Sequence, residues 1–417
     1  MNMTRRRTSI SLFSGIAGLD SGLHKAGFET IFCAEIDPNA RATLKLWLSE
    51  QKIESVVTSD VTQVNPHHLR RDLRLVPGEL DLLVGGSPCQ SFSVIGKRDS
   101  LVDERGLLLF QMVRYAEAFM PKVVLIEQVK GLKSAQCLKK KKGGVLENLV
   151  RNFQNLGYTV SYEVLRAADF GVPQIRDRLF LVASLEGKFL FPQPTHFPGT
   201  RTEVCGISFD KQLNPYKTVY NAIHDLPKPI LKGQTEYISN HVDVTPNRDR
   251  ERINGVPEGE CLARQFHLPL EQRQRLNPKK DTTKFRRLAW HEPSLTLRGG
   301  EVFYHPSENR YLTPRECLRL HGFSDTHVLV GPIRGRSGSV KTLDQHRLVA
   351  NAVPPLLAEV LGKSIVSQFF EDKRHTCAKR CLIVLSSTIA IGLPKISKTL
   401  GMNSDSESLL CSKLNHT

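Results

Sequence analysis

Over the first half of the chain, short apolar runs alternate with segments long enough to form helices. The apolar runs occupy residues 10–13, 30–34, 80–84, 123–126, 159–165 and 179–182. Runs of this length, separated by helical segments, are typical of βαβ units in which helices cover both faces of a sheet. The pattern predicts an α/β fold with a doubly wound parallel sheet from about residue 9 to residue 184.

A different pattern begins after Phe189. Prolines recur at positions 192, 194, 198, 215, 227, 229 and 246, and charged residues replace the aliphatic runs. Because proline interrupts helices and strands, we expect a second, smaller and irregular domain over residues 189–339. Residues 340–370 regain a helical apolar pattern and are expected to complete the first domain, which starts with residues 8–188. Residues 371–417 are expected to form a tail outside the core fold.

The chain is strongly basic. Its 417 residues include 58 Lys and Arg against 42 Asp and Glu, a formal net charge of +16. This charge favours a polyanionic partner, although it could also serve solubility alone. Basic residues are dense in part of the second domain, at Arg264, Arg273, Arg275, Lys279, Lys280, Lys284, Arg286, Arg287 and Arg298. This segment is a candidate surface for nucleic-acid phosphates.

Cysteine usage and the apolar segments bear on the compartment. The nine cysteines have no paired spacing, and the basic residues 1–7 lead directly into the first predicted strand. We therefore expect a reducing location, cytoplasmic or nucleoid-associated. The apolar stretch 381–393 is shorter than the roughly 20 residues that span a bilayer, so no membrane anchor is expected. His375, Cys377 and Cys381 lack a fourth zinc ligand, so no metal is expected.

A glycine-containing turn follows the first predicted strand. Gly15 and Gly18 would let the backbone approach a ligand, and the next helix would offer amide donors to an anionic group. Glu35 follows the second strand and Asp60 the third, where acidic side chains can bind a nucleoside. This set suits a cofactor with an adenosine and a positive centre better than one with a pyrophosphate. The same acidic residues could instead be helix caps and surface charges.

Reactive side chains also occur at predicted strand ends. Cys89 follows Pro88 where an apolar strand gives way to a loop, and Glu127 ends the next strand. Three residues whose side chains share one face precede the last strand, namely Gln174, Arg176 and Arg178. A thiol, a carboxyl and two guanidinium groups at one sheet edge predict a reaction site. The structural alternative for Cys89 is a small buried apolar residue.

Four segments occur in the order of one known family. They are Pro88-Cys89, Gln174-x-Arg176-x-Arg178, Arg310-Tyr311-Leu312-Thr313-Pro314-Arg315-Glu316 and Asn351-Ala352-Val353-Pro354. With them, residues 8–366 resemble the cytosine-C5 DNA methyltransferases, which use S-adenosylmethionine. The resemblance implies a Rossmann-like methyltransferase sheet and a target-recognition domain at residues 189–339. It also implies methyl transfer to a cytosine flipped out of a specific sequence in double-stranded DNA.

The resemblance assigns catalytic roles. Cys89 would attack C6 of the cytosine, Glu127 would serve N3 and the exocyclic amine, and Arg178 would bind O2. Gln174 and Arg176 belong to the same predicted catalytic set. Glu127 would need a raised pKa to hold its proton near neutral pH, which burial could provide. Residues 91–105 would close over the extruded base.

S-adenosylmethionine would be held by residues from several strand ends. The expected cofactor-binding residues are Phe13, Ser14, Gly15, Ile16, Gly18, Glu35, Ile36, Asp60, Val61, Pro88 and Asn351. By the resemblance, Glu35 would bind the ribose and Asp60 the adenine, while Asn351 would support the loop that carries Cys89. The expected DNA contacts, chiefly to phosphates, are Arg264, Arg273, Arg275, Lys284, Arg286, Arg287 and Arg298.

Three positions depart from the family pattern. Gln128 replaces the usual Asn after the catalytic Glu, and its extra methylene could misplace the hydrogen bonds that position the Pro88-Cys89 loop. Ser11 stands where many relatives have Asp, and Ala17 replaces a glycine.

The main hypothesis is therefore a monomeric DNA (cytosine-5)-methyltransferase. It would be either an orphan enzyme or the partner of a restriction endonuclease that acts separately. The alternatives are the same chemistry on RNA and a catalytically silent DNA-binding or regulatory homologue.

Overall fold

The computed structural model describes residues 6–88, 104–135, 143–199, 213–262, 269, 271, 285–299, 301–334 and 342–371. By its internal contacts, Met1–Phe369 forms one compact unit and Phe370–Thr417 a second. Apart from Glu371, the expected tail lies outside the described residues, so it stays a prediction.

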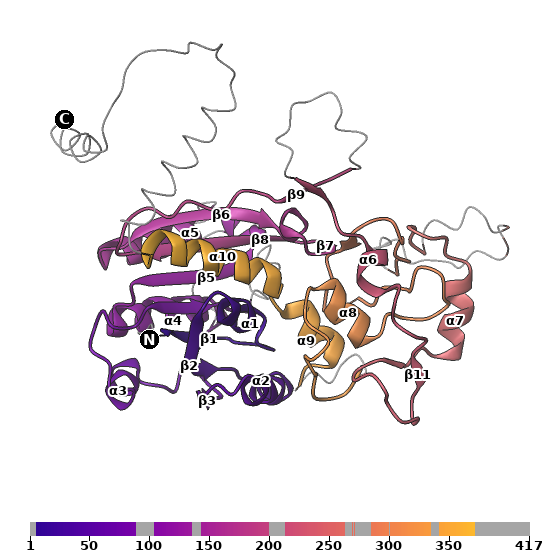
Figure 1. The fold of residues 1–417 in the computed structure, drawn as a ribbon, viewed down its shortest axis with the longest axis horizontal. Coiled ribbons are helices and arrows are strands. Elements are labelled where there is room, and N and C mark those ends of the chain that lie inside the picture. Colours follow the sequence, from indigo (N-terminus) through magenta and orange to yellow (C-terminus); the bar gives the residue numbers. More distant parts are fainter. Residues whose placement is uncertain are drawn as a thin grey trace, which may run out of the picture. The chain divides into compact units, whose positions relative to one another are not determined.

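A seven-stranded sheet forms the centre of the first unit (Figure 1). Its strands are β1 (Arg7–Leu12), β2 (Phe28–Ala34), β3 (Val56–Thr58), β4 (Leu82–Gly85), β5 (Val123–Val129), β6 (Thr159–Arg166) and β8 (Asp177–Ser184). They lie in the order β3-β2-β1-β4-β5-β8-β6. β4 and β5 are buried almost throughout, which explains their continuous apolar runs. The predicted α/β class with a doubly wound sheet is confirmed.

The predicted parallel sheet is only partly correct, because one strand is antiparallel to its neighbours. β1, β2, β3, β4 and β5 pair in parallel, but β8 runs antiparallel to both of its neighbours, β5 and β6. As a result the beginning of β8 lies at the edge where β5 ends, with Arg178 opposite Val129. The chain order also reverses between β1 and β4, and open α/β sheets bind ligands at such a switch point.

Helices cover both faces of the sheet. Apolar side chains of α3 (Pro66–Asp72), α4 (Glu104–Phe119) and α5 (Gly144–Asn155) form one core with the strands. On the other face, α2 (Pro38–Glu50) packs on Cys33, and α10 (Pro355–Phe369) packs along α1 (Gly18–Lys25). Figure 1 shows α10 beside α1 although they come from opposite ends of the compact unit. Residues 355–369 thus complete the helical layer on this face of the sheet.

The region between β8 and α10 has short elements. They are β9 (His196–Phe197), β10 (Asn214–Pro215), α6 (Val219–Ile223), β11 (Ile230–Leu231), β12 (Val242–Asp243), α7 (Asn247–Asn254), β13 (Ser294–Leu295), α8 (Pro314–Leu320) and α9 (Gln345–Asn351). Its apolar side chains form two further clusters, one around α8 and α9 and one around Ile253 and Tyr311. The first cluster also includes Ile16 and Ala40, so this region packs directly on the turn after β1 and on α2.

Local sequence sets where several helices begin. Asp37 Oδ1 accepts hydrogen bonds from the amides of Asn39 and Ala40, and Pro38 is the first residue of α2. Thr313 and Glu316 form a reciprocal capping box at α8. In the part of the chain that the structure describes, one stretch, Gln345–Phe369, is long and apolar enough to cross a membrane, but 67% of its apolar 18-residue window is buried inside the protein.

The contact between α1 and α10 depends on Gly22. A Cβ at this position would meet the carbonyl oxygen of Pro355 and lie 2.6 Å from Cβ of Ala358. Gly22→Ala should therefore lower the free energy of unfolding by about 1–3 kcal/mol, because backbone must move to admit the methyl group. Chemical denaturation measures this change. Gly131→Ala is the control, since its Cβ would have no neighbour nearer than 3.8 Å, and equal losses in both variants would contradict the prediction.

Candidate functional site

The turn after β1 is bound to the end of β2. Phe13 and Gly15 have positive φ angles of 58° and 57°, and the amide of Gly15 donates to Glu35 Oε2 at 2.7 Å. Glu35 Oε1 accepts a second hydrogen bond, from the amide of Asp37 at 2.8 Å. Burial raises the pKa of Glu35, while these two donors oppose the rise. The carboxylate is thus fixed beside a turn in which Gly15 adopts a backbone conformation that favours glycine.

The surroundings of Glu35 fit an adenosine-containing cofactor. A Cβ on Gly15 would have no atom within 4 Å, so the backbone of the turn borders open space. Ile36 is 68% exposed and offers an apolar surface for a flat ring beside a carboxylate that can accept from ribose hydroxyls. Asp60 Oδ1 is bound by the amide and hydroxyl of Thr62, and Val61 behind it is buried.

Other residues predicted to bind the cofactor make hydrogen bonds or packing contacts within the fold. Ser14 is buried and its hydroxyl donates to the carbonyl of Ser11. A Cβ on Gly18 would meet the carbonyl oxygen of Val353, so this glycine permits close packing of α1 on the segment that follows α9. Ile16 is buried in the cluster around α8 and α9, whereas Asn351 is exposed at the end of α9.

The sequence analysis missed a carboxylate beneath the turn. Asp20 is fully buried and accepts hydrogen bonds from Ser11 Oγ and Thr30 Oγ1, both at 3.0 Å. Burial raises its pKa to about 6. Ser11, which stands where many relatives have Asp, is therefore hydrogen-bonded to a carboxylate on α1. An acidic residue in the first turn of an apolar helix was the available signal.

Glu127 and Arg178 form the centre of the chemical site. Arg178 Nε lies 2.9 Å from Glu127 Oε1, with 14% and 11% of the two side chains exposed. The antiparallel pairing of β8 with β5 brings them together, since Glu127 lies opposite Phe180. Burial raises the pKa of Glu127, whereas the positive charges of Arg178 and Arg176 oppose the rise. A buried carboxyl group with a raised pKa beside a cation is suited to proton transfer or donation.

The loop after β4 is held against this pair. A Cβ on Gly86 would lie 3.0 Å from Glu127 Oε2, so a larger residue would press on the carboxylate. Gln128, buried completely, donates from Nε2 to the carbonyl of Ser87 at 2.9 Å and to Ser87 Oγ at 2.7 Å. The longer amide thus makes hydrogen bonds to the residue before Pro88. Cys89 and residues 91–103 lie outside the described residues.

Gln174 and Arg176, predicted to belong to the catalytic set, connect neighbouring segments of the chain. Both are buried, at 0% and 1% exposure. Gln174 bonds to Leu297, Leu320 and His321, and Arg176 donates to the carbonyls of Leu297, Ala350 and Ala352. Their polar groups are engaged by the backbone of neighbouring segments, because β7 (Gln174–Ile175) pairs with β13 and not with the central sheet.

The predicted DNA contacts separate into three groups. Arg264, Arg273, Arg275 and Lys284 lie outside the described residues. Arg287 does not fit the prediction, because it is buried and donates to the carbonyls of Ile253, Val256, His305, Pro306 and Glu308. Arg286 donates to the carbonyl of Gly259. Arg298 is exposed, and its side chain makes no hydrogen bond or ion pair with the described residues.

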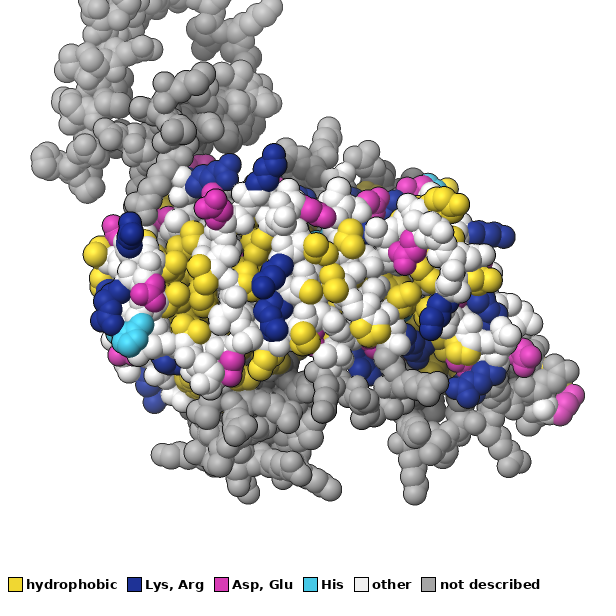
Figure 2. Space-filling view, turned by 90° about the horizontal axis from the view of Figure 1, so that it is seen from below, with side chains coloured by type: hydrophobic (Ala, Val, Ile, Leu, Met, Phe, Trp, Pro, Cys, Tyr) yellow, Lys and Arg dark blue, Asp and Glu magenta, His cyan; other side chains and the backbone are white. Residues whose placement is uncertain are grey.

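A cleft of about 1290 Å³ in the second region was not predicted. Its lining includes Gly299, Tyr311, Arg248, Arg334 and Arg347. The guanidinium of Arg334 lies 4.4 Å from the centre of the Tyr311 ring. On the face shown in Figure 2, several Lys and Arg side chains gather on the side where Figure 1 has α7 and β11.

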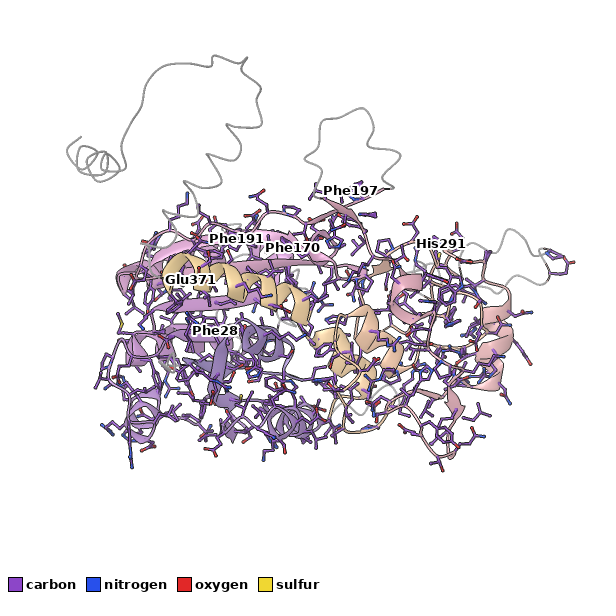
Figure 3. The ribbon with its side chains drawn as sticks, viewed as in Figure 1. Phe28, Phe170, Phe191, Phe197, His291 and Glu371 are labelled. Carbon is purple, nitrogen blue, oxygen red and sulfur yellow. The ribbon has the colours of Figure 1, made fainter. Side chains whose placement is uncertain are left out.

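Aromatic rings cluster on a different part of this region. Tyr220 stacks on His224 and His291 and meets Trp290 edge to face; His291 is labelled in Figure 3. Tyr220 is 44% exposed. Within the described ranges, no group of His, Cys, Asp or Glu side chains has the arrangement of a metal site.

Comparison with known proteins agrees with this geometry. The fold is similar to that of the S. pombe Dnmt2 methyltransferase, with a TM-score of 0.55 and 17% identity over 88% of this chain and 100% of that chain. The type II methyltransferase M.NgoFVII of Neisseria gonorrhoeae is 32% identical over 87% of both chains. M.AquIA of Picosynechococcus is 41% identical over 52% of this chain and 88% of its own length.

The fold and the family are those of S-adenosylmethionine-dependent methyltransferases. Residues 7–367 match the model of the C-5 cytosine-specific DNA methylases, and the chain belongs to this family. It is a DNA (cytosine-5)-methyltransferase, as the order of its motifs predicted.

The hydrogen bonds of Gln128 generate a prediction. Gln128→Asn should lower the single-turnover rate of methyl transfer several-fold, because the shorter amide cannot keep both bonds to Ser87, and it should leave S-adenosylmethionine affinity unchanged. Rapid-quench assays and cofactor titration measure the two quantities. Gln154→Asn, an exposed change on α5, is the matched control. A wild-type rate in Gln128→Asn would show that these bonds do not position the loop.

Proposed function

We propose that Cys89 forms a covalent bond with a cytosine flipped out of double-stranded DNA and that Glu127 and Arg178 bind this base. The carrying observation is the buried Glu127–Arg178 pair directly beside the loop that leads to Cys89. A cytosine inside the duplex stack cannot be attacked at C6, so extrusion precedes chemistry.

The proposed reaction balances as an addition followed by an elimination. The Cys89 thiolate adds to C6, and the electron pair of the C5–C6 bond becomes available at C5. S-adenosylmethionine would supply an electrophilic methyl group; the methyl carbon would bond to C5 while the methyl–sulfur bond breaks and its electron pair stays on sulfur. Loss of the C5 proton to a base then re-forms the double bond and expels Cys89 as thiolate.

Glu127 would supply the electrophilic activation. A protonated carboxyl can donate to N3 of cytosine, which withdraws electron density from C6, and the second oxygen can accept from the exocyclic amine. Burial favours the protonated form of Glu127, in line with this role. Arg178 would place a positive charge near O2, where negative charge develops during attack.

The cofactor would lie at the switch point between β1 and β4. Phe13 and Gly15 would border it, Glu35 would accept from the ribose hydroxyls, and Ile36 and Asp60 would contact the adenine. The fixed Glu35 carboxylate and the open space beside Gly15 support this assignment.

The remaining proposals concern the enzyme's setting. The names of the type II relatives support a role in restriction and modification, with an endonuclease acting separately. We further propose that the enzyme is a cytoplasmic or nucleoid-associated monomer that needs no metal. The intact Glu127–Arg178 pair favours activity over a catalytically silent homologue.

The first test is bisulfite sequencing of DNA from a methylation-free host. Host cells that express the wild-type chain should show protected cytosines in one sequence context, and Cys89→Ser should abolish this protection while DNA binding persists. Serine keeps the shape of the side chain but is a much poorer nucleophile at C6. Wild-type protection in Cys89→Ser would refute the covalent role of this residue.

Glu127→Gln should slow single-turnover methyl transfer by about 100-fold or more, since the amide cannot deliver a proton to N3. Its rate should also lose a pH dependence that the wild type has. In the wild type the rate should fall as the pH rises through the raised pKa of Glu127, because the carboxyl then loses the required proton. Glu163→Gln, an exposed change on β6, is the control, and an unchanged rate in Glu127→Gln would place the proton donor elsewhere.

A further inference from the structure

Arg176 is a buried cation that is held by backbone carbonyls. It is 1% exposed, and in the described part of the chain no carboxylate lies within ion-pair distance of it. Its two terminal nitrogens donate to Leu297 O at 3.2 Å, Ala350 O at 2.8 Å and Ala352 O at 2.9 Å. The charge of Glu127 acts on Arg176 without direct contact. Burying a guanidinium that has no direct ion pair is costly, so this arrangement indicates a role beyond filling space.

The carbonyls of Ala350 and Ala352 lie at the end of α9, where the helix has partial negative charge. They provide a counter-charge that a single acidic side chain would otherwise supply. Because the planar guanidinium reaches α9 and the Leu297 segment at the same time, it fixes the distance between them. A lysine has one nitrogen and cannot span these acceptors.

The Leu297 segment has further attachments to β7. Leu297 N donates to Gln174 Oε1 at 3.2 Å, and Thr296 Oγ1 donates to the carbonyl of Ile175 at 2.6 Å. β13 pairs with β7 immediately before these residues. The backbone of residues 294–297 is therefore fixed to β7 by main-chain and side-chain hydrogen bonds.

The chain changes character directly after this attachment. Arg298 and Gly299 are exposed, and Gly299 lines the cleft of the second region. The carbonyl of Gly299 accepts from Arg347 Nε on α9 at 3.2 Å. An exposed arginine on a backbone fixed at both ends suits the reading of a base edge, because little conformational freedom is lost on binding.

The other end of β7 leads to the chemical site. Arg176 is followed by the first residues of β8, and Arg178 contacts Glu127. Hydrogen bonds between residues 174–176 and residues 294–297, followed by the short backbone from Arg176 to Arg178, thus connect the exposed residues 298–299 to the Glu127–Arg178 pair. A displacement of either would be transmitted through Arg176 and its acceptors.

We propose that Arg176 is a positioning residue that fixes residues 298–299 relative to the Glu127–Arg178 pair. Recognition of the DNA sequence and methyl transfer would then depend on the same hydrogen bonds of Arg176. The inference rests on the proposed function of that pair. It assigns Arg176 to sequence discrimination and not to contact with the cytosine.

The test measures methylation at cognate sites and at sites that differ by one neighbouring base pair. The cognate sequence comes from bisulfite sequencing of the wild type, and single-turnover rates on short duplexes give the ratio of the two rates. In Arg176→Lys this ratio should fall about 10-fold, with S-adenosylmethionine affinity unchanged. Arg151→Lys, an exposed arginine on α5, is the matched control and should keep the wild-type ratio.

A second pair of variants keeps the test decisive if Arg176→Lys does not fold. Thr296→Val removes the hydroxyl bonded to Ile175 with little change in shape and should lower the same ratio, whereas Thr296→Ser keeps the hydroxyl and should restore it. A fall in both rates with an unchanged ratio in the folded variants would show a merely structural role and overturn the inference. A wild type that methylates no site would overturn the proposed function and the inference together.

Discussion

The pairing of a buried carboxyl with a guanidinium at the edge of the sheet determines how the rest of this enzyme is arranged. Glu127 and Arg178 come from strands that run in opposite directions, and only this direction lets the end of one meet the beginning of the other. The loop after β4 fits beside this pair because residue 86 is a glycine. The amide of Gln128 holds the same loop through its hydrogen bond to the carbonyl of Ser87. Burial gives the carboxyl its raised pKa, and the neighbouring cations keep that rise in check.

Most of the sheet could be predicted from the sequence, because strands buried on both faces appear as short, continuous apolar runs. The direction of β8 could not, since hydrophobic periodicity is the same for parallel and antiparallel strands. That error matters for function, because it is the antiparallel direction that delivers Arg178 to Glu127. The motif order was sufficient to predict the family, and the match of residues 7–367 to the family model confirms it.

The roles within the predicted site were harder to separate. Gln174, Arg176 and Arg178 share one alternating pattern, yet the first two are bound by carbonyls of segments more than a hundred positions away in the chain. Likewise Arg287 looks like a surface cation in the sequence but is buried among carbonyl groups. Such partners are tertiary, so no local pattern reports them. Asp20 was overlooked for the same reason.

The packing of α10 on α1 has a consequence for how the enzyme is made. The helix that follows the cofactor turn has no room for side chains at Gly18 and Gly22, because Val353 and Pro355 of the opposite chain end occupy that space. On the ribosome, where the N-terminal part emerges first, this surface stays uncovered until the segment that follows α9 has been synthesised. The packing surface of α1 in the catalytic half is therefore covered only once residues 353–369 are available, after the region between β8 and α10 has been made.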